Sequence, residues 1–159
     1  MRGVIDALQS LRGIAQISAV SIMAELGELS RFEHPRQLMG YSGAVSHEHS
    51  SGERIRRGAI SKAGNAHLRR IVVEAAWAYR HRPAVGKALA ARQRRSTAAI
   101  TALAWKAQQR LHQRYARLTR RGKCKQQTVT AVGRELLGFI WAIGVQVERE
   151  VNVPMRQAA

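Results

Sequence analysis

Acidic residues are scarce in this chain, which has 10 Asp and Glu against 27 Lys and Arg in 159 residues. Asp6 is the only aspartate, so this sequence alone cannot assemble the carboxylate cluster that two-metal phosphoryl transfer requires. No acidic residue occurs between Ala75 and Gly133. A surface that serves only solubility mixes charges of both signs, so a cationic stretch of this length indicates a polyanionic partner.

Cysteine and long apolar runs are also scarce. Cys124 is the only cysteine, which excludes an internal disulfide and is typical of a reducing cytoplasm. No apolar segment is both long enough and free enough of charge to span a bilayer, and residues 136–147 are predicted to form a core helix. The first eight residues lack the hydrophobic region of a signal peptide. We therefore expect a cytoplasmic protein with no membrane partner.

Arginine dominates the cations, and its planar guanidinium suits bidentate contact with phosphate. The span without acids carries many of these cations: Arg80, Arg82, Lys87, Arg92, Arg94, Arg95, Lys106, Arg110, Arg114, Arg117, Arg120, Arg121, Lys123 and Lys125. A field of one sign over this length is the electrostatic footprint of nucleic acid. An anionic membrane fits less well, because the basic helix predicted here lacks a large aromatic edge. We expect DNA or structured RNA as the partner.

The composition and periodicity predict an all-α domain. Hydrophobic residues make up 45% of the chain, and apolar residues recur at helical spacing in three segments: 65–79, 96–118 and 128–147. Asn65 and Ser96 are predicted N-caps, with an arginine-rich link around residues 92–95 between the first two helices. We expect one domain over residues 1–150 and a frayed tail over 151–159.

The segment Ile5–Leu29 predicts two helices with a break at Gly13. Gly13, Ile14 and Ala15 place a hydrophobic residue between two small ones, as in a helix-hairpin-helix element, whose backbone N–H groups face a phosphate. A plain helical corner is an equal alternative. Its expected core residues are Ile14, Ile17, Ala19, Ile22 and Met23.

The most informative segment is 43–70, which reads GAVSHEHSSGERIRRGAISKAGNAHLRR. Ser50 and Ser51 precede Gly52, and glycine lets a backbone approach a ligand closely. Six cations follow them: Arg54, Arg56, Arg57, Lys62, Arg69 and Arg70. Cations attract a phosphodiester and stabilise charge on its oxygens, so either serine is a candidate nucleophile in a long functional loop. A solvated surface loop is the competing interpretation.

Two histidines, His47 and His49, flank Glu48 just before the serines. Histidines two apart share a face only on a strand, and no Cys or Asp neighbours them, so a metal site is poorly supported and none is predicted. One of them could deprotonate a serine. Solvation of the loop and contact with phosphate are the more common roles.

The predicted helix over 96–118 carries a cationic ridge. Lys106, Arg110 and Arg114 lie four residues apart on the face opposite the apolar stripe, so we predict that they face solvent and contact phosphate. The three tryptophans are predicted to be core residues rather than platforms for base stacking: Trp77, Trp105 and Trp141.

Three segments of the chain closely resemble the C-terminal domain of the transposases of insertion sequences 110, 116 and 902. These segments are LRGIAQISAVSIMAELGELSRF, QLMGYSGAVSHEHSSGERIRRGAISKAGNAHLRR and VTAVGREL, and the match covers most of the chain. The specific part is 49–70, where SSG precedes RRGAISKAGNAHLRR. Ser42, Ala44 and Ser46 depart from the pattern, because the family has a leucine–glycine–leucine and a proline around Gly43.

The resemblance implies an α-helical recombination domain whose loop serine attacks a DNA phosphodiester and holds the strand as a phosphoserine. Counting back from residues 61–64 assigns this role to Ser50, which is slightly preferred, whereas counting forward from Gly43 assigns it to Ser51. The resemblance also implies that complete enzymes act as homo-oligomers with a guide RNA that pairs with donor and target DNA.

Complete members of that family also carry a RuvC-like nuclease half with four acidic metal ligands, and nothing in this sequence resembles it. We therefore expect a truncated or split transposase that is inactive alone. A divalent metal is expected only in the missing acidic half, and no cofactor in this chain. One alternative is a nucleic-acid-binding module or remnant without catalytic activity. Another is a basic structural protein that coats RNA or binds ribosomes.

Overall fold

Helices make up most of the structure, which confirms the predicted all-α class. The computed structural model describes the backbone of residues 1–51, 54–61 and 63–157, and the side chains of these residues except 46–59 and 152–157. The helices in these ranges are α1 (Arg2–Leu8), α2 (Gln16–Leu26), α3 (Pro35–Tyr41), α4 (Ala66–Ala76), α5 (Lys87–Gln93), α6 (Ala98–Arg120) and α7 (Lys125–Gln157), with a 3-10 turn at Trp77–Arg80.

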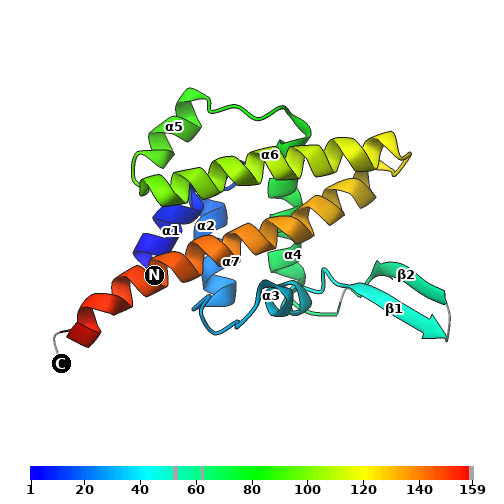
Figure 1. The fold of residues 1–159 in the computed structure, drawn as a ribbon, viewed down its shortest axis with the longest axis horizontal. Helices are drawn as coiled ribbons and strands as arrows, with labels where there is room; N and C mark the ends of the chain where they lie inside the picture. Colours follow the sequence, from blue (N-terminus) through cyan, green and yellow to red (C-terminus); the bar gives the residue numbers. More distant parts are fainter. Residues whose placement is uncertain (52–53, 62, 158–159) are drawn as a thin grey trace.

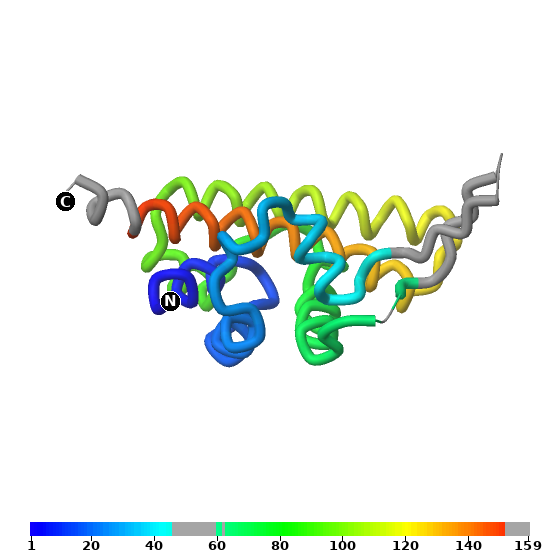
Figure 2. Tube along the Cα trace, turned by 90° about the horizontal axis from the view of Figure 1, so that it is seen from below, coloured from blue at the N-terminus to red at the C-terminus, as the bar shows by residue number. Residues whose placement is uncertain are grey.

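The two longest helices, α6 and α7, run side by side through the molecule (Figure 1). In the view of Figure 2, α2 and α4 lie together on one side of this pair. Helix α7 packs against α1, α3, α4 and α6, so it is the central core helix.

The core face of α7 follows the predicted period. Its fully buried residues recur at intervals of three and four: Val129, Val132, Leu136, Ile140 and Ile143. The helix is longer than predicted and, by length and composition alone, could cross a membrane, which the sequence analysis did not anticipate. However, 56% of its most apolar window is buried against the other helices, as expected for a core helix. Its backbone is helical as far as Gln157, and the frayed tail stays a prediction.

Local signals predicted some helix ends and missed others. Asn65 caps α4 as predicted, because its Oδ1 accepts a hydrogen bond from the Leu68 N–H at 2.9 Å. The predicted cap at Ser96 is wrong, since Thr97 caps α6 and its Oγ1 accepts from the Ile100 N–H at 3.4 Å. The arginine-rich link is partly wrong too. Its first residues belong to α5, whose sequence KALAARQ consists of good helix formers.

The corner between α1 and α2 is packed against α4. Gly13 has a positive φ of 84°, and an added Cβ would overlap the carbonyl oxygen of Ala75. Most of the predicted corner residues are buried: Ile14, Ala19, Ile22 and Met23. The prediction for Ile17 is wrong, because its side chain is 83% exposed. It lies two residues before Ala19, on the opposite side of α2.

Replacing Gly13 with alanine is expected to destabilise the domain by about 3 kcal/mol or more, because a left-handed conformation and a clash with backbone combine there. Gly27→Ala is the matched control, since Gly27 also has a positive φ (65°) but no atom within 4 Å of an added Cβ. The control should lose only about 1 kcal/mol. Chemical denaturation followed by circular dichroism measures both, and equal losses would contradict the packing of this corner.

Candidate nucleic-acid interface

The segment predicted to be a long loop contains a β-hairpin. Strand β1 (Ser46–Ser51) pairs antiparallel with β2 (Arg54–Ile60), and the hairpin leaves the helical body beside α3 and α4 (Figure 1). The Cα of Ser50 lies opposite Ile55, and that of Ser51 lies opposite Arg54. Both candidate nucleophiles are therefore at the end of β1, next to the connection between the strands.

Much of the predicted site lies outside the described part of the structure. Lys62 is outside it entirely. The backbone is described, but the side chains are not, for the following predicted residues: His47, Glu48, His49, Ser50, Ser51, Arg54, Arg56 and Arg57. The roles assigned to these side chains stay predictions.

The two ends of the hairpin segment are held together in a tight neck, formed by residues 41–45, 61 and 63–65. The Ser61 N–H donates to the carbonyl oxygen of Val45 at 2.8 Å, and the Asn65 N–H donates to that of Tyr41 at 2.9 Å. Gly43 and Gly64 both have positive φ, and an added Cβ at Gly64 would overlap the carbonyl oxygen of Tyr41. Glycine is therefore required where the two segments cross.

Arg69, on α4, forms a hydrogen bond with the backbone of the neck. Its Nη1 donates to the carbonyl oxygen of Ser42 at 2.8 Å, and its side chain is half-buried. Arg70, its neighbour, is exposed and free to meet a ligand. Of these two cations predicted to bind nucleic acid, Arg69 therefore has a structural contact and Arg70 has an exposed position.

Glu25, on α2, contacts the neck, and the sequence analysis did not identify it. Its carboxylate accepts from Nδ2 of Asn65 at 2.5 Å and pairs with Nδ1 of His67 at 2.6 Å. The hydrogen bonds from Asn65 and His67 lower the pKa of Glu25. The hydroxyl of Tyr41 donates to the backbone carbonyl of Glu25 at 3.2 Å. The sequence signal that could have identified Glu25 is the rarity of acidic residues, because each acid in so basic a chain is a candidate for a structural ion pair.

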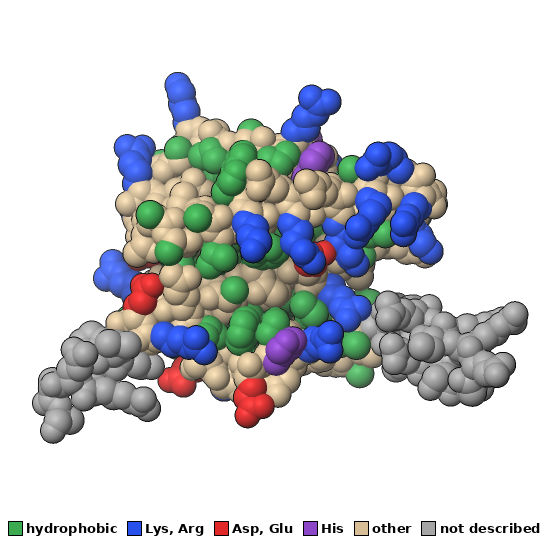
Figure 3. All heavy atoms as spheres, in the orientation of Figure 1, with side chains coloured by type: hydrophobic (Ala, Val, Ile, Leu, Met, Phe, Trp, Pro, Cys, Tyr) green, Lys and Arg blue, Asp and Glu red, His purple; other side chains and the backbone are tan. Residues whose placement is uncertain are grey.

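The cationic ridge of α6 is only partly free. Lys106 and Arg110 are exposed, as predicted, whereas the Arg114 side chain is only 31% exposed. Glu135 of α7 pairs with Arg110 and with Arg114, whose Nε lies 3.2 Å from Glu135 Oε2. The prediction that all three cations face solvent is thus wrong for Arg114. Other Lys and Arg side chains continue along α6 (Figure 3).

The tryptophans divide into two groups. Trp77 and Trp141 pack against the core, as predicted, and the Trp141 Nε1–H donates to the carbonyl oxygen of Phe32 at 2.8 Å. The prediction for Trp105 is wrong, because its side chain is 40% exposed on α6.

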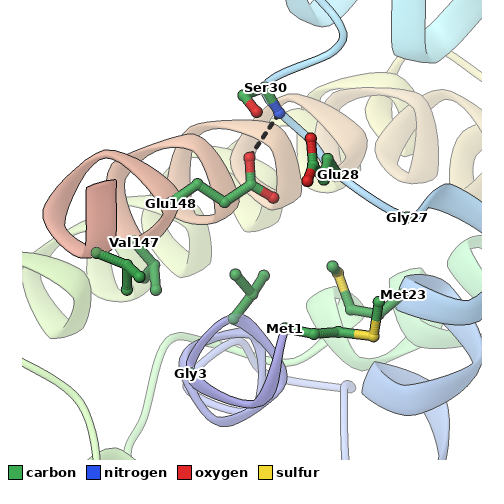
Figure 4. A pocket seen from close by; sticks show the side chains of 10 residues that line it. Met1, Gly3, Met23, Gly27, Glu28, Ser30, Val147 and Glu148 are labelled. Carbon is green, nitrogen blue, oxygen red and sulfur yellow. Dashed lines mark hydrogen bonds between the residues drawn. The ribbon is translucent and has the colours of Figure 1, made fainter. Parts of the chain in front are cut away.

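A cavity of about 190 Å³ lies between α1, α2 and α7, and Met1, Met23 and Val147 line it (Figure 4). At its edge the Glu148 carboxylate accepts from the N–H groups of Leu29 at 2.8 Å and Ser30 at 2.7 Å. These bonds fix the connection after α2 to α7. Glu28, Ser30 and Glu148 also line the cavity, so its lining combines carboxylates and a hydroxyl with thioether and aliphatic groups.

Among the side chains that the structure describes, no three His, Cys, Asp or Glu residues gather into a set that could hold a metal ion. The described part of the chain therefore offers cations and backbone donors to a ligand rather than a metal centre. Such groups suit phosphate oxygens.

Comparison with known proteins identifies the family of this chain. The sequence profile of the Transposase IS116/IS110/IS902 family matches residues 5–91, more than half of the chain. A transposase of Sinorhizobium fredii is 48% identical over 152 residues, covering 96% of this chain and 39% of the relative. The transposase for insertion sequence element IS1111A of Coxiella burnetii is 37% identical over 69 residues, covering 43% of this chain and 19% of the relative.

This chain thus spans about two fifths of the length of the first of these relatives. The matched residues include the corner at Gly13, the hairpin, its neck and α4. The chain belongs to the IS116/IS110/IS902 family of transposases.

Proposed function

We propose that this chain is the DNA-binding, serine-bearing part of a transposase. Ser50 or Ser51 attacks a DNA phosphodiester: the serine Oγ–P bond forms, one deoxyribose oxygen leaves, and the strand is held as a phosphoserine. The proton acceptor and a divalent metal come from a complementary acidic half. The proposal also includes a guide RNA, a homo-oligomeric complete enzyme and a cytoplasmic location.

The position of the two serines on the hairpin is the observation that carries this proposal. Ser50 and Ser51 lie four and five residues beyond Ser46, where β1 begins, and a strand rises about 3.3 Å per residue, so the serines are about 13 and about 17 Å along the strand. The neck anchors the base of the hairpin on α2 and α4. A serine presented at the far end of an anchored arm suits reaction with groups that belong to another part of the assembly.

Serine chemistry explains why a second part is needed. A serine hydroxyl is a weak nucleophile until a base takes its proton and cations stabilise the charge that develops on phosphate oxygens. The sequence next to the serines is rich in arginine but contains few acids: Glu48 and Glu53 are the only ones between residues 43 and 70. We therefore expect no strand cleavage by this chain alone.

The surface of the helical body supports a role in DNA binding. Exposed cations follow α6 to its end at Arg117, Arg120 and Arg121. At the corner, α2 begins without a side-chain cap at Ala15, and Gln16 is exposed, so backbone N–H groups there are open to a phosphate. This supports the helix-hairpin-helix interpretation of the corner.

A chimaera tests the proposed function. This chain would replace the matched segment of the Sinorhizobium fredii transposase, and excision of a marked element would be counted in cells. We expect the chimaera to excise the element, and a variant with both Ser50→Ala and Ser51→Ala to be inactive. The unaltered relative is the positive control.

A chimaera that is soluble and binds DNA but gives no excision would contradict the proposal. That result would favour the alternative, a nucleic-acid-binding module without chemistry, which the incomplete set of catalytic groups in this chain also fits.

A further inference from the structure

An exposed apolar surface lies where residues 81–86, the connection before α5, run along α6. It is formed by Trp105 of α6, which is 40% exposed, and Val85 of the connection, which is 46% exposed. We call this pair the Trp105 surface. Neither residue belongs to the core cluster or to the hydrophobic residues packed against it.

Two contacts fix the path of the connection relative to α6. Nδ1 of His112 lies 3.2 Å from the carbonyl oxygen of Tyr79, and the Ala84 N–H donates to Oε1 of Gln108 at 3.1 Å. The connection therefore runs antiparallel along α6, from His112 toward Gln108. Val85 follows Ala84 on this path, and Trp105 lies about one turn before Gln108 on α6, so we infer that their side chains are neighbours.

The surroundings of this surface are cationic. Arg82 and Lys87 flank Val85, and Lys106 follows Trp105, all within the span that contains no acidic residue. Arg82, Lys87 and Lys106 are not in any ion pair with the described residues. In Figure 3, hydrophobic side chains gather near α6 between Lys and Arg side chains on both sides.

We propose that the Trp105 surface binds an unpaired base of single-stranded DNA, which stacks on the indole while the flanking cations contact its phosphates. An aromatic face among cations suits this ligand, because every base has a π-face and each phosphate carries a negative charge. A duplex keeps its bases paired and stacked inside, so none of them can stack on the indole. The inference rests on the proposed function, in which DNA is the substrate, and adds the state of the strand that is bound.

Charge complementarity also favours DNA over a protein as the occupant. A neutral or basic protein partner would have to cover the indole and desolvate Lys106 and Arg82 without anions to pair with them. A second copy of this chain, with 27 basic and 10 acidic residues, would add charge of the same sign.

The test compares Trp105→Ala, Trp105→Phe and Val151→Ala. Val151→Ala is the matched control, because it removes part of an apolar side chain that is 61% exposed on α7, away from the elements proposed to bind DNA. Fluorescence anisotropy would give the affinity of the whole chain for a labelled 12-nucleotide single strand and for a 12-base-pair duplex in the same buffer. We expect Trp105→Ala to weaken single-strand binding by about 5- to 100-fold, as the loss of one stacked base does.

The same experiment has further expected results. Trp105→Phe should keep most of the affinity, while the single-strand affinity of Val151→Ala and the duplex affinities of all variants should change by less than about twofold. The single strand should also quench the tryptophan emission of the unaltered chain more than that of Trp105→Ala.

Several results would overturn the inference. These are an equal effect of Trp105→Ala and Val151→Ala on single-strand binding, an equal loss for duplex and single strand, or dependence on Trp105 only for RNA of the same sequence. A change in oligomeric state by Trp105→Ala with unchanged DNA binding would instead assign the surface to self-association. If the unaltered chain bound neither form of DNA, the proposed function itself would fail.

Discussion

Raising the salt concentration from about 50 to about 200 mM is expected to weaken binding of this chain to duplex DNA about a thousandfold. A protein that neutralises phosphates releases the counterions condensed on DNA, so its affinity falls steeply as salt rises. The estimate assumes contact with about six phosphates, each contributing about 0.9 to the slope of log affinity against log salt. The long series of cations without acids between Ala75 and Gly133 motivates it.

Two single variants make this measurement specific to the structure. Lys106→Gln should lower the slope by about 0.9 and leave the free energy of unfolding nearly unchanged, because Lys106 is exposed. Arg114→Gln should lower the slope less, since its guanidinium is engaged by Glu135, and should cost more stability because that acid is left without one of its partners. A flat response to salt, or no binding at low salt, would remove the nucleic-acid interpretation.

Helix periodicity predicted the fold well where burial follows from local sequence. The apolar stripes of α4 and α7 and the cap at Asn65 are local signals, and the structure confirms them. Ile17 and Trp105 are exceptions, because their exposure depends on what other elements cover. The connection over residues 81–86 runs along α6 and is bonded there at Gln108, and no periodicity in α6 encodes that path.

The candidate site was predicted less completely. Sequence reasoning located the hairpin segment by its serines, glycines and arginines, but not its paired strands, because their residues do not alternate in hydrophobicity. It also missed the neck. Glu25 is 40 residues from Asn65 in sequence, and only the packing of α2 against α4 brings them together. Arg69 looked like a ligand for phosphate, whereas the structure gives it a backbone partner.

Removing both serines is expected to abolish covalent attachment of DNA to the protein. The described hydroxyls near the hairpin base already donate to backbone carbonyl oxygens: Tyr41 to Glu25, Ser42 to Met39 and Ser61 to Ala63. Each single variant, Ser50→Ala and Ser51→Ala, should retain a different amount of adduct, since only one of the two oxygens forms the bond. The residue whose loss abolishes the adduct is the nucleophile.

The most direct measurement is therefore to trap this adduct. The chimaera with the remainder of the Sinorhizobium fredii transposase would be incubated with labelled DNA and the proposed guide RNA and run on a denaturing gel, and the DNA-linked peptide would be mapped by mass. We predict an adduct on the peptide that contains Ser50 and Ser51, lost in the double alanine variant and absent when this chain is incubated alone. An adduct that survives the double substitution would contradict the serine mechanism, and a strong adduct from this chain unaided would contradict its dependence on a second half.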